Sequence, residues 1–358
     1  MVATTEKPTL ALIPKLAAWN DRYHWRAVLL TGYVILALAS LGFSGVPVDR
    51  EQVVLVIMGG LALSCIGRPV SEMLRIAFDW LPFTLALAIY DLARGLAARL
   101  DRPISYRWQI SVDKFLFLGH VPAQVLQQHF FSYTHIRWYD VFGSVIYMSY
   151  FIVPFVVAGC LWRRDWPAWR AFATRFVVIA FVSAFWFAIQ PTAPPWAAAR
   201  DSHNTLLQLE LRDGKPKSSR GMEVLGLHQA TKLVNKGRAS SNDYAAVPSL
   251  HTGFSVLVAL TLLPRTKRKW LRFLIISYPV AMVLTLVYNG EHYVSDTLIG
   301  ATVVILISWA ELATRARRQA YWERLSAEHW PKLAARLAPP GTEERQRAAD
   351  LAAAASEV

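Results

Sequence analysis

The feature of this sequence that most constrains its fold is a series of long apolar runs, several of which approach the roughly 20 residues that a helix needs to cross a bilayer. Backbone N–H and C=O groups find no water in the bilayer core, so such runs must satisfy those groups internally, as helices. We expect eight spanning helices, at about residues 27–41 and beyond, 53–66, 76–96, 141–162, 171–189, 249–264, 270–288 and 294–312. The predicted fold class is therefore all-α: a polytopic integral membrane protein with about eight transmembrane helices.

The charge of the chain fits a membrane partner. Charged residues make up 18% of the 358 residues, whereas soluble domains carry about 25%. The formal net charge of +13 indicates contact with anionic lipid and a basic cytoplasmic face, rather than binding to nucleic acid. The membrane is thus an expected partner and nucleic acid is not, while the sequence predicts no particular oligomeric state.

Short basic loops predict the orientation of the helices. Three clusters of arginine and lysine should face the cytoplasm, at residues 163–170, 265–272 and 315–318. Alternation then puts the N-terminus inside and residues 190–249 outside. Residues 99–140 would lie outside although they carry five basic residues. Their amphipathic middle, residues 108–131, is therefore expected to form helices that lie in the membrane interface.

This topology divides the chain into three parts. Residues 1–75 form an N-terminal segment with two additional helices, residues 76–312 form a membrane core with an outer loop at 191–248, and residues 313–358 form a cytoplasmic tail. We expect the chain to be an integral membrane protein of the plasma membrane. The outer ends of the core helices face the extracytoplasmic side.

Two short motifs place histidines at a predicted membrane boundary. Val247-Pro248-Ser249-Leu250-His251 begins one spanning helix, and His292-Tyr293-Val294-Ser295-Asp296 begins another. Asp296 lies four residues after His292, one helical turn away on the same face. The predicted topology brings both histidines to the outer side of the membrane.

Two imidazoles and an aspartate are a sufficient set for phosphoryl chemistry. A carboxylate at Asp296 that accepts a hydrogen bond from one ring N–H of His292 fixes the tautomer and leaves the other nitrogen free to attack. Backbone N–H groups at the helix start that carries His251 form an anion site, and Ser249 adds a hydroxyl donor. One histidine can attack phosphorus while the other protonates the leaving alkoxide. This scheme requires no metal and no organic cofactor.

Two other interpretations fit the same residues. Each histidine by itself could be an interfacial side chain that water satisfies, but two motifs on one face with Asp296 in register argue against this. Two histidines and a carboxylate could also hold zinc with one open position. No HExxH-type spacing supports that metal site.

Pro248-Ser249-Leu250-His251 and His292-x-x-x-Asp296 resemble the second and third signature motifs of the type 2 phosphatidic acid phosphatase superfamily. The resemblance implies a six-helix core of the lipid phosphatase type, over roughly residues 76–312. It also implies that His251 is the acid/base, that His292 is the nucleophile and that Asp296 orients His292.

The chain departs from the phosphatase pattern at two places. No Lys-x6-Arg-Pro motif stands at the outer end of the fifth predicted helix, where the sequence is Gln190-Pro191-Thr192-Ala193-Pro194-Pro195-Trp196, and Thr285-Leu286 replaces the Ser-Arg that opens the third motif. Both departures remove phosphate-binding cations. They resemble the inositol-phosphorylceramide synthase-like, or inositolphosphotransferase, branch, as do the strings at residues 90–94, 113–127 and 242–247. Many members of that branch have a histidine where this chain has Tyr150 in Tyr147-Met148-Ser149-Tyr150.

Further polar residues are candidates for substrate binding. Asp91 and Arg94 lie one turn apart on the third predicted helix, where they either pair with each other or serve the substrate. Arg200 and Arg220 lie in the outer loop and could replace the missing phosphate cations. With Ser249, these four residues complete the predicted substrate-binding set.

The sequence as a whole predicts a metal-independent lipid phosphotransferase. It would move a phosphoryl group or phospho-headgroup from a phospholipid donor to a lipid or glycan alcohol, through a phosphohistidine. One alternative is a lipid phosphate phosphatase that acts on phosphatidic acid or a polyprenyl diphosphate. Another is a non-enzymatic lipid-handling or transport protein, against which the complete His–His–Asp set argues.

Overall fold

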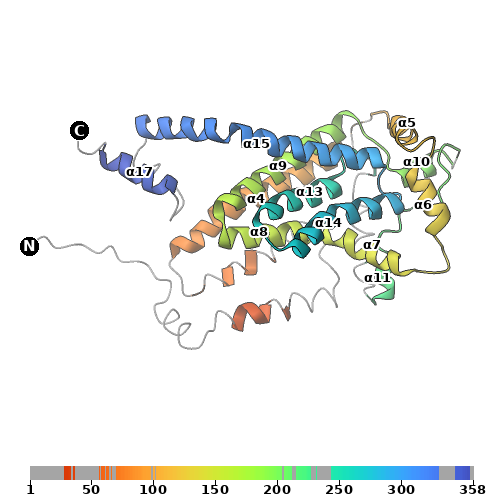
Figure 1. Ribbon diagram of the computed structural model, residues 1–358, viewed down its shortest axis with the longest axis horizontal. Coiled ribbons are helices and arrows are strands. Elements are labelled where there is room, and N and C mark those ends of the chain that lie inside the picture. Colours follow the sequence, from red (N-terminus) through yellow and green to blue (C-terminus); the bar gives the residue numbers. More distant parts are fainter. Residues whose placement is uncertain are drawn as a thin grey trace, which may run out of the picture.

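The computed structural model describes residues 28–33, 35–36, 56, 58–60, 62–63, 66, 70–97, 100, 102–203, 205–211, 215–226, 231, 243–329 and 343–354. Almost all of this part is helical (Figure 1). Its elements are α4 (Val70–Ala97), α5 (Arg107–Leu116), α6 (Pro122–Phe130), α7 (Trp138–Ser149), α8 (Val153–Arg164), α9 (Trp166–Ile189), α10 (Pro195–Asp201), α11 (Arg220–Val224), α13 (Leu250–Leu262), the short 3₁₀-helix η1 (Leu263–Arg265), α14 (Lys269–Tyr288), α15 (Val294–His329) and α17 (Glu343–Ala354).

Three described helices are long and apolar enough to cross a membrane: α9, α14 and residues 294–314 of α15. α7 and α8 together would make a fourth span, bent by 46°. The predicted all-α, membrane-spanning architecture is confirmed at this level. The first two predicted spans, residues 27–41 and 53–66, are described only in part, so the count of eight stays a prediction.

The fourth predicted span, residues 141–162, is wrong as a single helix. Pro154 lies in the first turn of α8 and has no N–H to donate to the carbonyl of Tyr150, which breaks the helical ladder. The backbone N–H groups of Tyr150 and Phe151 instead donate to the carbonyls three residues earlier, those of Tyr147 and Met148, at 3.3 and 3.1 Å. Such bonds are typical of a 3₁₀ turn. The break places Tyr150 at a bend that faces the neighbouring helix α13.

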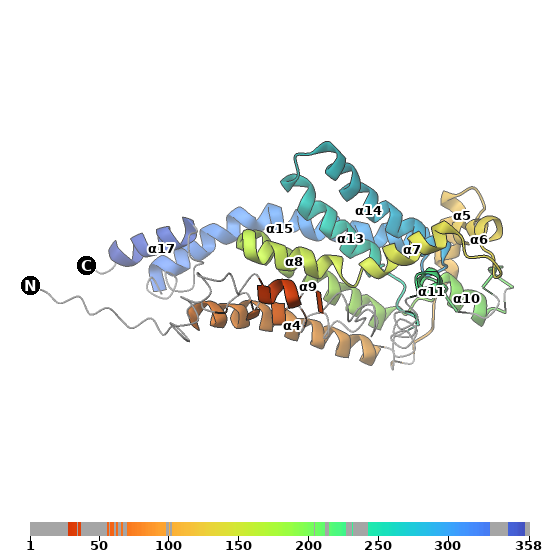
Figure 2. The same cartoon turned by 90° about the horizontal axis from the view of Figure 1, so that it is seen from below.

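The predicted interfacial stretch, residues 108–131, forms the two short helices α5 and α6. Together with α10 they gather at one end of the bundle, where α9 ends and α14 is followed by α15 (Figures 1 and 2). Two parallel bridges, Ser105 to Thr192 and Thr192 to Ala245, tie three loop segments together at this end.

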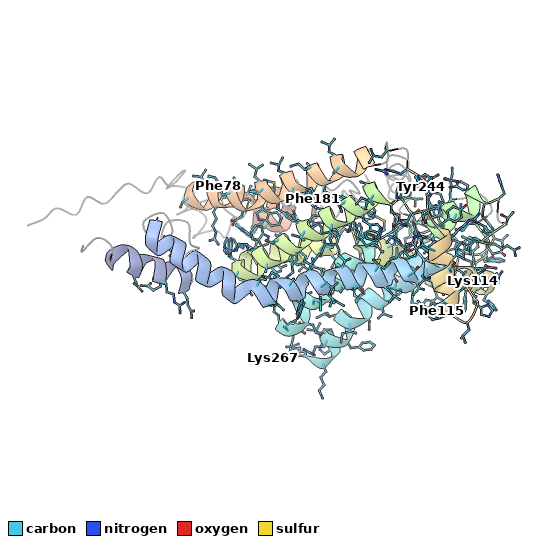
Figure 3. The ribbon with its side chains drawn as sticks, turned by 90° about the horizontal axis from the view of Figure 1, so that it is seen from above. Phe78, Lys114, Phe115, Phe181, Tyr244 and Lys267 are labelled. Carbon is cyan, nitrogen blue, oxygen red and sulfur yellow. The ribbon has the colours of Figure 1, made fainter. Side chains whose placement is uncertain are left out.

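Two separate hydrophobic clusters hold the described part together. The larger lies between the bundle helices, where the rings of Phe176 on α9 and Phe254 on α13 stack with centroids 3.7 Å apart. The smaller lies at the end of the bundle and joins α5, α6 and α10 to Tyr293 at the start of α15. The outward faces of the long helices are apolar, as a lipid environment requires; examples are Phe78 on α4 (Figure 3), Phe185, Phe273 and Trp309.

The helix α13 packs against the first turns of α15 with almost no space between them. The Ser249 N–H, just before α13, donates to the carbonyl of Asp296 at 3.2 Å. A Cβ added at Gly300 would lie 2.4 Å from the Ser249 carbonyl oxygen. Small residues allow such close backbone approach between membrane helices, so Gly300 fixes how near the two helix starts can come.

Replacement of Gly300 by alanine should therefore separate α13 from α15. We expect the Gly300→Ala variant to lose about 1–3 kcal/mol of stability, the usual effect of overpacking, and to unfold at a lower temperature in detergent. Gly159→Ala in α8 is the matched control, because no heavy atom lies within 4 Å of the added Cβ. Equal unfolding temperatures for the two variants would contradict this account of the contact.

Candidate active site

His251 lies in the first turn of α13, which Ser249 caps. The Ser249 side chain accepts a hydrogen bond from the Thr252 N–H at 3.4 Å, and its hydroxyl also lies 3.3 Å from the Thr252 hydroxyl. This is the usual role of serine at a helix start. Pro248 precedes the cap and lies outside the helix. Ser249 thus holds the helix start in place, and its predicted contact with phosphate stays a prediction.

His292 and Asp296 flank the start of α15. The His292 Nδ1 atom faces Asp296 Oδ2 at 3.5 Å, which is long for a hydrogen bond but leaves Nε2 as the nitrogen that points away from the carboxylate. The same Oδ2 accepts a hydrogen bond from the Tyr293 N–H at 3.0 Å. Asp296 is completely buried and His292 is 5% exposed, so the protein holds this pair rigidly.

The two motif histidines come together, as the predicted topology required. The ring centroids of His251 and His292 lie 5.8 Å apart at an angle of 61°. His292 is buried and His251 is half-buried. Two imidazoles at this separation can address opposite sides of one phosphorus atom, with one as the nucleophile and the other as the proton donor.

Two tyrosines enclose the His251 ring, and sequence reasoning missed this role. The Tyr147 ring stacks on it with centroids 5.0 Å apart, and the Tyr150 ring lies 4.0 Å away. Tyr150 stands where many members of the resembled branch have a histidine, so that position does reach the site. The available signal in the sequence was the three-residue spacing of Tyr147 and Tyr150. Only the helix break before Pro154 turns the Tyr150 side chain towards α13.

Asp113 is the second residue that sequence reasoning did not place. Its carboxyl group accepts hydrogen bonds from the N–H groups of Val294 and Ser295, at 3.0 and 2.9 Å. Asp113 is completely buried; burial raises the pKa of its carboxyl group, and the hydrogen bonds lower it only in part. A carboxyl group at a helix N-terminus satisfies free N–H groups and the positive end of the helix dipole. Asp113 on α5 thereby fixes the helix start that follows His292.

Gln127 on α6 fixes the other side of the same turn. Its side-chain N–H donates to the carbonyl of Tyr288 at 3.0 Å, and its side-chain oxygen accepts from the Glu210 N–H at 3.2 Å. It is completely buried. The end of α14 and the start of α15 are therefore both held by the short helices at the end of the bundle.

The predicted phosphate cations are already engaged within the protein. Arg200 hydrogen-bonds to Asp201 at 2.8 Å and to Asp243 at 3.3 Å. Burial lowers its pKa, but the bonds to these carboxylates more than offset this and raise it above the usual value. Arg220 is 9% exposed and donates to the carbonyls of Ser132 and His135.

Neither arginine is shown to bind a substrate, so that role stays a prediction for both. Arg220 also lies 3.9 Å from Asp140, which places it at the N-terminal end of α7. Asp91 and Arg94 lie on α4, but their side chains fall outside the described residues. In the described part, no group of three or more His, Cys, Asp or Glu residues could hold a metal ion.

Comparisons with known proteins agree with the motifs. A family model described as the PAP2 superfamily matches residues 107–310, more than half of the chain, and the matched segment contains both histidines and Asp296. The phosphoinositol dihydroceramide synthase of Bacteroides thetaiotaomicron is similar, with 26% identity over 287 residues that cover 78% of this chain and 88% of that protein. No solved structure matches the chain. The predicted family resemblance is confirmed.

Loss of the Asp113 carboxyl group should disturb catalysis through position. We expect Asp113→Ala to lower kcat by about 100-fold, the cost of a misplaced reacting group, with a smaller change in KM for the donor. Asp113→Asn should restore part of the rate, because an amide oxygen still accepts a hydrogen bond. Ser111→Ala, at an exposed site on α5, is the control. A lower unfolding temperature with an unchanged kcat would show that Asp113 serves stability alone.

Proposed function

The chain belongs to the PAP2 superfamily, and we therefore propose that it is a membrane lipid phosphotransferase that passes a phospho-headgroup from a phospholipid to an alcohol. The observation that carries this proposal is the meeting of His251 and His292, with Asp296 in register behind His292. The transferase is favoured over a phosphatase because the Lys-x6-Arg-Pro motif and the third-motif arginine are absent. A site with fewer cations suits a singly charged phosphodiester better than a dianionic monoester.

The proposed reaction has two half-reactions. His292 Nε2 attacks phosphorus, a P–N bond forms, and the P–O bond to the lipid alcohol breaks as His251 gives that oxygen its proton. The acceptor hydroxyl then attacks phosphorus, gives its proton to His251, and the P–N bond breaks. Asp296 holds the His292 tautomer throughout. Every proton is exchanged between His251 and an alcohol, so the cycle is balanced.

The similar Bacteroides protein suggests which substrates to examine first. It is named for phosphoinositol and dihydroceramide, so we propose an inositol-phosphate headgroup for the donor and a lipid alcohol of that type for the acceptor. A lipid or glycan alcohol of another kind is compatible with the same chemistry. The competing functions are those of a lipid phosphate phosphatase and of a non-enzymatic lipid carrier.

The described part of the outer loop favours transfer, because one segment of it contacts the residue before His292, and we propose that this segment covers that turn. In this segment, residues 218–224, Ser218 donates a hydrogen bond to Glu291, the residue before His292. The Gly221 N–H donates to the Ser144 hydroxyl at 3.0 Å. A Cβ at Gly221 would lie 2.5 Å from the Asp140 carbonyl oxygen, so the segment packs directly on α7. A cover of this kind can keep water from the intermediate.

We also propose that the active site faces the extracytoplasmic side, within the eight-helix topology that the basic loops predict. Figure 3 shows Lys267 extending from the turn between η1 and α14, away from the end that carries Lys114 and Phe115. The candidate site lies at that second end, near α5 and α6 (Figure 1).

The proposed intermediate predicts a covalent adduct on His292. Incubation with labelled phosphatidylinositol, followed by acid-free digestion and mass spectrometry, should locate an inositol-phosphoryl group there. His292→Ala should abolish the adduct and the activity, and Asp296→Asn should reduce turnover by up to about 10⁴-fold because it favours the wrong tautomer. An adduct on His251 instead would reverse the two roles, and absence of any adduct or turnover would favour a lipid carrier.

Transfer should exceed hydrolysis while residues 218–224 pack against α7. With phosphatidylinositol as the donor, the unmodified protein should produce more transferred lipid than free inositol phosphate once dihydroceramide is present. Gly221→Ala should lift the segment off α7 and raise the ratio of hydrolysis to transfer, whereas Gly159→Ala should leave it unchanged. Rapid phosphate release from phosphatidic acid or a polyprenyl diphosphate, unaffected by any acceptor, would establish the phosphatase instead.

Cysteine labelling tests the sidedness. Cys65 and Cys160 are first replaced by serine, and single cysteines are introduced at Lys267 and at Thr205, both outside the helices. An impermeant thiol reagent applied to intact cells should label position 205 and should reach position 267 only after the membrane is opened. The reverse pattern would place the site in the cytoplasm.

A further inference from the structure

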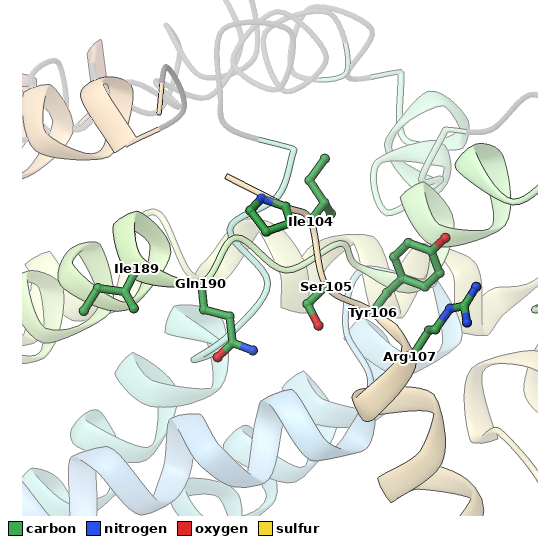
Figure 4. A pocket seen from close by; sticks show the side chains of 7 residues that line it. Ile104, Ser105, Tyr106, Arg107, Ile189 and Gln190 are labelled. Atoms are coloured by element: carbon green, nitrogen blue, oxygen red, sulfur yellow. The ribbon is translucent and has the colours of Figure 1, made fainter. Parts of the chain in front are cut away.

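A cavity of about 410 Å³ opens at the outer end of α9 (Figure 4). Its wall comes from two segments: residues 103–107, which lead into α5, and Ile189–Gln190, which end α9. In Figure 4 the Gln190 amide and the Ser105 hydroxyl point to the same side, with Ile189 at one end and Arg107 at the other. Its size lies in the range of about 300–1,000 Å³ that is usual for small-molecule sites.

The cavity lies level with the catalytic residues. The helix α9 packs against α13, and α13 begins at the end of the bundle where α9 finishes (Figure 1). Hydrogen bonds also connect the wall to the segment that leads into α13. Ser105 bridges to the segment around Thr192, and the Thr192 hydroxyl accepts the Val247 N–H at 2.9 Å, four residues before His251.

The chemistry of the wall is that of a site for a neutral polar group. Gln190 offers both a donor and an acceptor, Ser105 and Tyr106 add hydroxyls, and Arg107 is the one charged residue in the lining. A phosphodiester held without metal needs several cations or free backbone N–H groups. Uncharged groups that both donate and accept hydrogen bonds, such as hydroxyls and amides, fit this lining better.

The surroundings of the cavity supply a place for an alkyl chain. Ile189 in the cavity wall and Phe185 one turn before it are 57% and 68% exposed, on a helix apolar enough to span the membrane. A lipid tail could lie along this face while its head enters between Ile104 and Ile189. The cavity is therefore open towards the region that lipid occupies.

We propose that this cavity binds the head of the acceptor: a neutral, long-chain lipid alcohol that carries hydroxyl and amide groups. The proposal rests on the transferase function and names the acceptor subsite within it. The acceptor enters only after the lipid alcohol of the donor has left, so we assign the cavity to the second half-reaction. Gln190 is the residue that recognises the acceptor head.

The two half-reactions provide the test. Formation of the inositol-phosphoryl adduct from phosphatidylinositol alone reports on the donor, and transfer to dihydroceramide in mixed micelles reports on the acceptor. Gln190→Leu should raise the acceptor KM by about 2- to 12-fold, the value of one neutral hydrogen bond, and should leave the rate of adduct formation within about 2-fold. Gln128→Leu, at an exposed glutamine on α6, should change neither.

A second variant guards against misfolding at position 190. Ile104→Trp narrows the cavity from a side chain that is 40% exposed, and it should reduce transfer to dihydroceramide more than transfer to a short, soluble alcohol. An unchanged acceptor KM in both variants, with normal adduct formation, would overturn the acceptor subsite alone. A slower adduct formation in both would assign the cavity to the donor and also overturn it. If the unmodified protein forms no adduct, the transferase function and the subsite both fail.

Discussion

The contact between the starts of α13 and α15 is the interaction on which the site depends. Apolar helices gain little from each other in lipid, so their approach is governed by shape and by hydrogen bonds. Here Gly300 leaves room for the Ser249 carbonyl, and the Ser249 N–H donates to the carbonyl of Asp296. Both histidines follow from this contact, because each lies within a few residues of it. A bulkier residue at position 300 would move His251 relative to His292 without altering either residue.

The sequence was sufficient for the parts of the site that depend on local spacing. Three features could be derived from the chain: the pairing of His292 with Asp296, the serine near His251 and the two amphipathic helices at residues 108–131. The structure differs in one respect, since His292 lies before the first residue of α15 and not on its helical face. Asp113 could not, because its hydrogen bonds reach across about 180 residues to Val294 and Ser295. Tyr150 could not either, since its contact with His251 depends on the bend that Pro154 introduces.

The arginines show why counting charges in a loop is a weak guide to ligand binding. Arg200 and Arg220 were natural candidates for the missing phosphate cations, since both lie in the outer loop. Arg200 is paired with two carboxylates. Arg220 is buried and donates hydrogen bonds to two backbone carbonyls. Removal of a buried charge that has such partners is destabilising in itself. A loss of activity on neutralising Arg220 would therefore need a stability control before it could be assigned to substrate binding.

The two hydrophobic clusters of the described part differ in how well the fold shields them. The bundle cluster is shielded by long helices, whereas the cluster around α5, α6, α10 and Tyr293 sits at the end of the molecule and is tied by short elements. Local regions with fewer contacts open at lower free energy than the core. Detergents that mimic the bilayer interior but not its surface would release the cluster at the end of the molecule first. A preparation could then retain full helix content and a sharp chromatographic peak while the turn that carries His292 had already lost its supporting contacts. Circular dichroism and activity would then report two different transitions.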